Sequence, residues 1–144
     1  METSVVRQRV LELLRQIKRP DADRRADRRA QTDQATQEFD AFLKRVAVPL
    51  FKQVADVLRA EGFKFDVFTP GSTVRLMGSR GNDEYLEIAL DTKGSAPKLL
   101  CRASRVHAGD VMQTELVLNA TADISALTDE DLLGFLLSEL ETLL

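Results

Sequence analysis

Residues from which catalytic and metal sites are usually built are almost missing from this sequence. Among its 144 residues it has one histidine, His107, one cysteine, Cys101, and no tryptophan. A zinc site made of histidines and cysteines needs several of them, so the sequence holds no such set. A single cysteine also excludes a disulfide within the chain and is typical of a reducing compartment. We therefore predict a cytoplasmic protein without a metal or other cofactor.

Nucleophilic catalysis would have to rely on the same two residues. Cys101 falls on the core-facing row of a predicted strand and His107 in a predicted turn six positions later, so we interpret the cysteine as a buried structural residue. The sequence has no Gly-x-Ser-x-Gly elbow, and its glycines match neither a phosphate-binding loop nor a dinucleotide fingerprint. These absences favour a protein without catalytic residues, with an enzyme as the alternative.

Long apolar stretches are missing as well. No segment approaches the ~20 apolar residues that a membrane span needs, and the first residues carry an early acid and no apolar segment of secretory length. We therefore expect no membrane span and no signal peptide. The composition is that of an ordinary globular protein, with 44% hydrophobic residues, 30% charged residues and a net charge of −3.

The charges are unevenly distributed along the chain. Lys18–Arg29 has six bases against three acids, whereas residues 120–144 have six acids and no lysine or arginine. Such an asymmetry can steer a partner or complement a second copy. A weaker hypothesis is nucleic-acid binding through Arg24, Arg25, Arg28 and Arg29. The interleaved aspartates reduce the positive charge that phosphate binding needs, and no aromatic residue precedes position 38 to stack on bases, so a solvated segment is favoured.

The first 19 residues are predicted to form an N-terminal helix. Its main apolar residues follow one another in steps of four, three and four, at Val6, Val10, Leu13 and Ile17. A coiled coil is identified from about three or four heptads, so packing on the chain's own domain is favoured and pairing with a second copy is the alternative. Pro20 is expected to end or kink this helix, or to begin a new one. Residues 20–35 are predicted to be an exposed charged helix or a linker.

Residues 36–144 are predicted to form a single α+β domain around a core helix, Phe39–Leu58. The predicted apolar stripe of this helix is Phe39, Phe42, Leu43, Val46, Leu50, Val54, Val57 and Leu58. Pro49 interrupts it at a cost of ~3 kcal/mol, which predicts one bent helix or two shorter ones.

A C-terminal helix is predicted to begin at a capping box made by Thr128 and Asp131. Its predicted stripe is Leu133, Leu136, Leu137, Leu140 and Leu144, with Leu132 and Phe135 beside it. Gly134 lies within this helix at a cost of ~1 kcal/mol relative to alanine, which indicates close packing there.

Between these helices the apolar period changes to two. Alternation predicts five strands joined by short turns, near residues 63–68, 73–79, 85–90, 99–103 and 111–118, with Met112, Leu116 and Leu118 of the last one facing inward. Short connections make these strands an antiparallel meander. We therefore predict an α+β fold in which helices cover one face of a five-stranded sheet. The order of elements resembles that of cystatin-like cupped sheets and of small secretion chaperones, and a shared order carries no function by itself.

Charged residues of alternating sign fall on the outward row of four successive predicted strands. They are Arg75, Glu87, Arg102 and Glu115, and Tyr85 lies on the same face. A solvated face with cross-strand ion pairs is the favoured interpretation. The alternative is a site at which an arginine and a carboxylate bind a small ligand, with these five residues as the candidates.

The sequence predicts a non-catalytic protein–protein interaction module, adaptor-like or chaperone-like, that forms a homodimer, because two-fold dimers are the commonest oligomers. Its partner is expected to be a second copy or another protein and not a membrane, with nucleic-acid binding through Arg24–Arg29 as the weaker alternative. The alternative is a small-molecule binder or enzyme that uses the sheet face away from the helices.

Overall fold

The computed structural model describes residues 1–94, 96–119 and 123–144, with the backbone alone at residues 18–22. The chain divides into two units, Met1–Gln34 and Ala35–Leu144. The longest helix, α1 (Thr3–Phe42), contributes residues to both units.

The first unit is helical from Thr3 onward. The expectation that the first helix ends at Pro20 is wrong, because the backbone at Pro20 and in the charged segment after it is α-helical. Alanine, arginine and glutamine make up most of residues 22–34, and all three are good helix formers.

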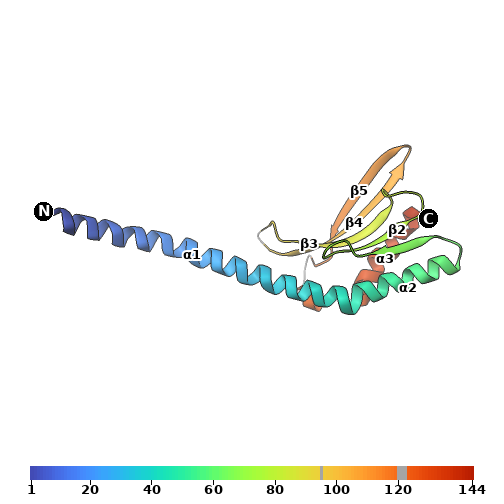
Figure 1. Ribbon diagram of the computed structural model, residues 1–144, viewed down its shortest axis with the longest axis horizontal. Coiled ribbons are helices and arrows are strands. Elements are labelled where there is room, and N and C mark those ends of the chain that lie inside the picture. The colour runs from blue at the N-terminus through green and yellow to red at the C-terminus, as the bar shows by residue number, and fades with distance from the viewer. Residues whose placement is uncertain (95, 120–122) are drawn as a thin grey trace. The chain divides into compact units, whose positions relative to one another are not determined.

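In the second unit the predicted core helix is bent. It consists of the last turns of α1, a π-helical segment η1 (Leu43–Ala47) and helix α2 (Val48–Ala60), and its axis turns between α1 and α2 (Figure 1). The N–H of Val48 donates to the carbonyl of Leu43, five residues back, as in a π-helix. Pro49 then lies in the first turn of α2, directly after the π-helical segment.

The wider turn changes which residues of this helix are buried. Buried positions follow at intervals of four, at Phe39, Leu43, Ala47, Phe51 and Ala55. The predicted stripe is therefore wrong beyond Leu43, because it includes Val57, which is 64% exposed, and omits Phe51, which is fully buried. Its other members are only partly buried at the rim of the core: Val46, Leu50, Val54 and Leu58. A π-helical turn holds more residues than an α-helical one and so rotates the following side chains.

The sheet has five antiparallel strands in the order β1-β2-β3-β4-β5, which confirms the predicted meander and the α+β class. The strands are β1 (Phe65–Phe68), β2 (Val74–Gly78), β3 (Tyr85–Asp91), β4 (Lys98–His107) and β5 (Asp110–Val117). β4 and β5 are joined by Ala108 and Gly109, whose φ angles of 52° and 85° are those of a two-residue type I′ turn.

The core lies between one face of the sheet and the helices. The largest fully buried side chains of the sheet come from β2, β3 and β4: Val74, Leu76, Leu86, Ile88, Leu99 and Cys101. They form one cluster with Phe39 and Phe51 of the bent helix and with Leu132 and Leu136 of α3 (Asp129–Leu143). Helices therefore cover one face of the sheet, as predicted.

Helix α3 begins as predicted but buries a different face. The N–H of Asp131 donates to Oγ1 of Thr128 at 3.3 Å and the N–H of Thr128 donates to Oδ2 of Asp131 at 2.9 Å, which is the expected capping box. The buried residues are Leu132, Phe135, Leu136, Leu140 and Leu143. Leu137 and Leu144 of the predicted stripe are exposed, since the leucines cover a sector of this helix that is broader than the face that packs, and spacing alone does not select its buried part. The close packing expected at Gly134 is also wrong, because no described atom beyond its chain neighbours and its own helix backbone lies within 4 Å of the place a Cβ would take.

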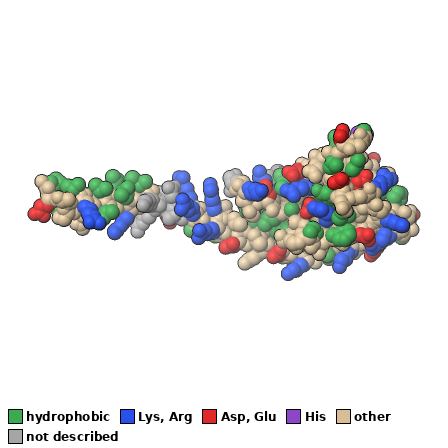
Figure 2. Space-filling view, turned by 45° about the horizontal axis from the view of Figure 1, so that its top comes forward, with side chains coloured by type: hydrophobic (Ala, Val, Ile, Leu, Met, Phe, Trp, Pro, Cys, Tyr) green, Lys and Arg blue, Asp and Glu red, His purple; other side chains and the backbone are tan. Residues whose placement is uncertain are grey.

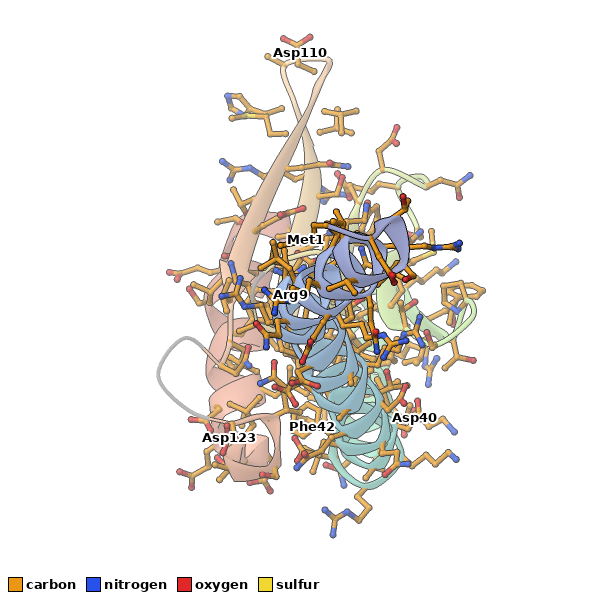
Figure 3. All side chains as sticks on the ribbon, turned by 90° about the vertical axis from the view of Figure 1, so that its left-hand side faces the viewer. Met1, Arg9, Asp40, Phe42, Asp110 and Asp123 are labelled. Carbon is orange, nitrogen blue, oxygen red and sulfur yellow. The ribbon has the colours of Figure 1, made fainter. Side chains whose placement is uncertain are left out.

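The edge strand β5 is exposed along almost its whole length. Met112 and Leu116 were expected to face the core, yet they are 43% and 52% exposed. The expectation is wrong because the helices pack mainly on β1, β2 and β4 and leave β5 outside their cover. Strand β3 begins at Tyr85, opposite Ser104 of β4. Past this point β4 and β5 continue as a two-stranded hairpin with Asp110 at its tip (Figure 3).

Candidate functional site on the outer sheet face

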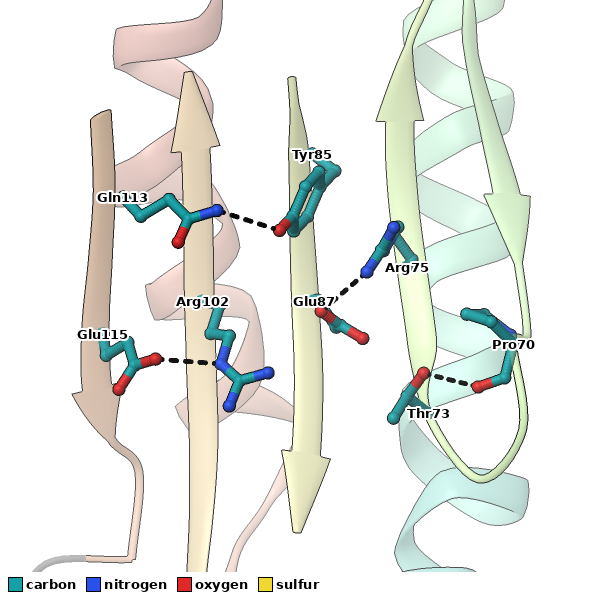
Figure 4. A network of polar contacts seen from close by, with 8 residues as sticks. All are labelled: Pro70, Thr73, Arg75, Tyr85, Glu87, Arg102, Gln113 and Glu115. Carbon is teal, nitrogen blue, oxygen red and sulfur yellow. Dashed lines mark hydrogen bonds and ion pairs between the residues drawn. The ribbon is translucent and has the colours of Figure 1, made fainter. Parts of the chain in front are cut away.

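The four charged residues singled out in the sequence form one continuous row across the sheet. Arg75 lies opposite Glu87, Glu87 opposite Arg102, and Arg102 opposite Glu115. A nitrogen of the Arg75 guanidinium is 3.1 Å from Oε2 of Glu87, and Nε of Arg102 is 3.0 Å from Oε1 of Glu115 (Figure 4). The row therefore holds two ion pairs and no net charge.

Tyr85 lies in the next row of the same face and fixes Arg75 from a second side. The guanidinium carbon of Arg75 is 4.0 Å from the centre of the Tyr85 ring, within the range of a cation–π contact. Nε2 of Gln113 donates to the Tyr85 hydroxyl at 3.4 Å. The structure thus brings all five candidate residues onto one patch that extends across four strands, β2 to β5: Arg75, Tyr85, Glu87, Arg102 and Glu115.

Part of this patch is buried although it is the face away from the helices. Glu87 is 5% exposed and Ser104, which lies opposite Tyr85 and Gln113, is 1% exposed. A buried carboxylate is costly unless it is paired, so Arg75 compensates Glu87. Nε of Arg75 and Oγ of Ser104 are buried without a hydrogen-bond partner among the described residues. The sequence-based set did not include Ser104, although its parity with Arg102 on β4 indicates the same face.

The chemistry open to this patch is limited by its own pairing. An incoming anion would compete with Glu87 or Glu115 for the arginines, because each arginine already contacts a carboxylate. The two buried atoms without partners, one N–H and one hydroxyl, are the polar groups left for a small ligand. None of the five candidates lines the two described clefts of about 230 and 440 Å³, which lie beside Phe65 and Leu144 and between α2 and β1.

Cys101 and His107 do not form a catalytic pair. Both belong to β4, where six residues separate them by ~20 Å along the strand. Cys101 is fully buried, and this burial raises the pKa of its thiol to about 12, so the reactive thiolate is suppressed. Within the described parts of the chain no group of three or more histidine, cysteine or acidic residues is placed to hold a metal ion. No described helix is long and apolar enough to span a membrane.

A different surface is exposed in the first unit. Its helix carries seven large apolar side chains that are 39–59% exposed: Val5, Val6, Val10, Leu11, Leu13, Leu14 and Ile17. Apolar side chains gather along one side of this helix and basic ones along the other (Figure 2). We call this set of seven the N-terminal apolar face. The arginines at 24, 25, 28 and 29 lie further along the same helix and are exposed.

No protein-family model matches the chain, and no curated protein and no solved structure matches it either. The charged row, the N-terminal apolar face and the open strand β5 are therefore the features that bear on function.

Proposed function

We propose that this protein is a non-catalytic protein–protein interaction module that forms a homodimer through its N-terminal apolar face. The observation that carries the proposal is the exposure of seven large apolar side chains on one helix. Contiguous exposed apolar patches on soluble proteins mark interaction sites, because leaving them in water is unfavourable. Burying a valine, leucine or isoleucine contributes ~1.5–3 kcal/mol.

The spacing of these residues supports a second copy as the partner. Val6, Val10, Leu13 and Ile17 take the positions d, a, d and a of two heptads, so two such helices bury them against each other in one seam. Branched Val10 and Ile17 at a, with Leu13 at d, favour a parallel two-stranded pair.

Charges beside the seam agree with the parallel arrangement. Glu2 takes position g and Arg7 the e position that faces it from the second helix, so an acid meets a base on each side of the seam. A seam of two heptads is short, and we expect a dissociation constant on the order of micromolar.

The test is the mass of the full chain in sedimentation equilibrium. The double variant Leu13→Lys, Ile17→Lys places two like charges in the seam and is expected to abolish association through this helix, so that the mass falls below that of the wild type without loss of helix content. The matched control, Ser4→Lys with Gln8→Lys, adds the same charges at outer positions and should keep the wild-type mass. A wild-type chain that sediments as one chain at tens of micromolar would overturn the proposal, as would equal masses of the two variants.

A small-ligand site on the outer sheet face is the second candidate. Its support is the pair of buried atoms without partners, Nε of Arg75 and Oγ of Ser104. Calorimetry with small carboxylates and phosphates would test it. Binding that is lost in Ser104→Ala but kept in Gln113→Ala, with the fold unchanged, favours this candidate, and no binding by the wild-type chain counts against it.

A further inference from the structure

β5 is an open edge of the sheet with few of the features that protect such edges. It pairs with β4 on one side only, it is eight residues long, and it contains no proline, lysine or bulge. Edge strands usually carry such features because their unpaired N–H and C=O groups attract other strands. The opposite edge, β1, has only four residues and is followed by Pro70. The two edges of this sheet therefore differ in how open they are to a further strand.

The hydrogen-bond pattern identifies the free groups of β5. The N–H of Leu118 donates to the carbonyl of Leu99 at 2.9 Å, so Leu118 directs its backbone groups toward β4. These directions alternate along an antiparallel strand. Asp110, Met112, Thr114 and Leu116 therefore also face β4. The backbone N–H and C=O groups that point away from the sheet belong to Val111, Gln113, Glu115 and Val117.

We propose that β5 pairs antiparallel with β5 of a second copy, about a two-fold axis at Thr114, so that two sheets join into one continuous sheet. In this register Val111 faces Val117 of the second copy, and Gln113 faces Glu115. Every outward-pointing residue then meets an outward-pointing residue, so all the free backbone groups of β5 find partners. A register centred on Gln113 leaves Val117 without a partner.

Side chains select the same register. On one face Met112 meets Leu116 of the second copy, and on the other Val111 meets the half-buried Val117, so the exposed Val111, Met112 and Leu116 are covered by apolar residues. The two acids of β5 avoid each other in this register, since Glu115 meets the amide of Gln113 and Asp110 meets Leu118 of the second copy. A register centred on Gln113 would instead place Val111 against Glu115. A register shifted by one residue would bring side chains of opposite sheet faces together.

Because β5 is complementary to itself, the strand that pairs with its open edge is assigned to a second copy of the chain. An isologous contact requires the strand to match its own reverse, and β5 does so in backbone groups, apolar pairs and charge. The inference rests on other residues than the N-terminal apolar face, so either contact can fail while the other holds.

Cysteine cross-linking tests the register. Thr114 faces Thr114 of the second copy as a non-hydrogen-bonded pair, whose Cα atoms lie ~4.5 Å apart, within the range of a disulfide. The Thr114→Cys substitution is introduced into the Leu13→Lys, Ile17→Lys variant. In this variant the helix seam is removed, so a cross-link reports on β5 alone. Asp110→Cys is the matched control, because it is equally exposed but lies ~26 Å from its own equivalent in this register. The native Cys101 is buried.

Under mild oxidation Thr114→Cys should form a covalent dimer roughly tenfold faster than Asp110→Cys, because only the former brings two thiols within disulfide range. Equal rates would overturn the pairing. A faster reaction of Gln113→Cys than of Thr114→Cys would overturn the register.

A proline variant tests the role of the outward backbone. Gln113→Pro removes an N–H that points away from the sheet and none that β4 uses, so the chain should fold and the Thr114→Cys cross-link should fall to the control rate. Gln113→Ala keeps that N–H and should cross-link like Thr114→Cys alone. If the proline variant does not fold, Val111→Lys places a charge against Val117 and should have the same effect. Unchanged cross-linking in the folded edge variant would contradict the proposal.

Discussion

Cys101 shows how position alone determines the behaviour of a side chain. It lies on β4 between Ile88 of β3 and Leu116 of β5, and it is fully buried. Burial disfavours the charged thiolate and raises the thiol pKa from 9.0 to about 12. The alternation of apolar residues predicts this inward orientation, and the structural role expected for the cysteine agrees with it.

The raised thiol pKa predicts a loss of stability in alkali. Below pH 9 the thiol is protonated in the folded and the unfolded chain, so its contribution is fully present. Between pH 9 and 12 the unfolded chain releases the proton and the folded chain keeps it, so the free energy of unfolding falls by up to about 1.4 kcal/mol per pH unit. Urea unfolding at pH 8 and pH 10 should show the wild type losing more stability than Cys101→Ala. Parallel losses would contradict this prediction.

At the same scale, the sequence predicts the neighbours in the charged row but not their burial. Short turns and a period of two are enough to place Arg75, Glu87, Arg102 and Glu115 side by side. Glu87 pairs with Arg75, which in turn contacts the Tyr85 ring, and such side-chain contacts come from χ angles that no alternation pattern contains. For the same reason the buried hydroxyl of Ser104 is found only in the structure.

The sequence predicts the strands and helices of the second unit and their order. It does not predict which face of each helix is buried. The π-helical turn at Leu43–Ala47 rotates α2, so a stripe extrapolated at 3.6 residues per turn selects Val57 in place of Phe51. In α3 the leucines cover a sector broader than the buried face, so packing decides which of them are buried. Strand β5 is predicted with the right parity, but its exposure depends on how far the helices extend over the sheet.

Helix α3 provides a prediction at this scale. Gly134 is a helical residue with open space around the position of a Cβ, so Gly134→Ala should cost nothing in packing. Alanine removes freedom from the unfolded chain and favours the helix, and the free energy of unfolding should rise by about 0.5–1 kcal/mol. Urea denaturation measures this gain. Gly78→Ala is the contrasting variant, because its added Cβ would lie 3.3 Å from the ring of Phe65, and it should not stabilise the protein.

For the molecule as a whole, the division into two units predicts that the core folds without the first one. Among the described residues, every buried member of the hydrophobic core lies between Ala35 and Leu143. A chain of residues 35–144 should therefore unfold cooperatively, with a urea midpoint close to that of the full chain. It should also lose the dimer made by the N-terminal apolar face while keeping the cross-link at Thr114→Cys. Circular dichroism and sedimentation measure both, and a fragment without a cooperative transition would contradict the prediction.

The open edge of β5 also has a consequence for aggregation. Its unpaired N–H and C=O groups, with Val111, Met112 and Leu116 beside them, form a template on which strands of unfolded chains can add. When a second β5 covers this edge, the template is closed. Dilution that separates the copies would then favour aggregation, the reverse of what is usual for proteins that aggregate from concentrated solution.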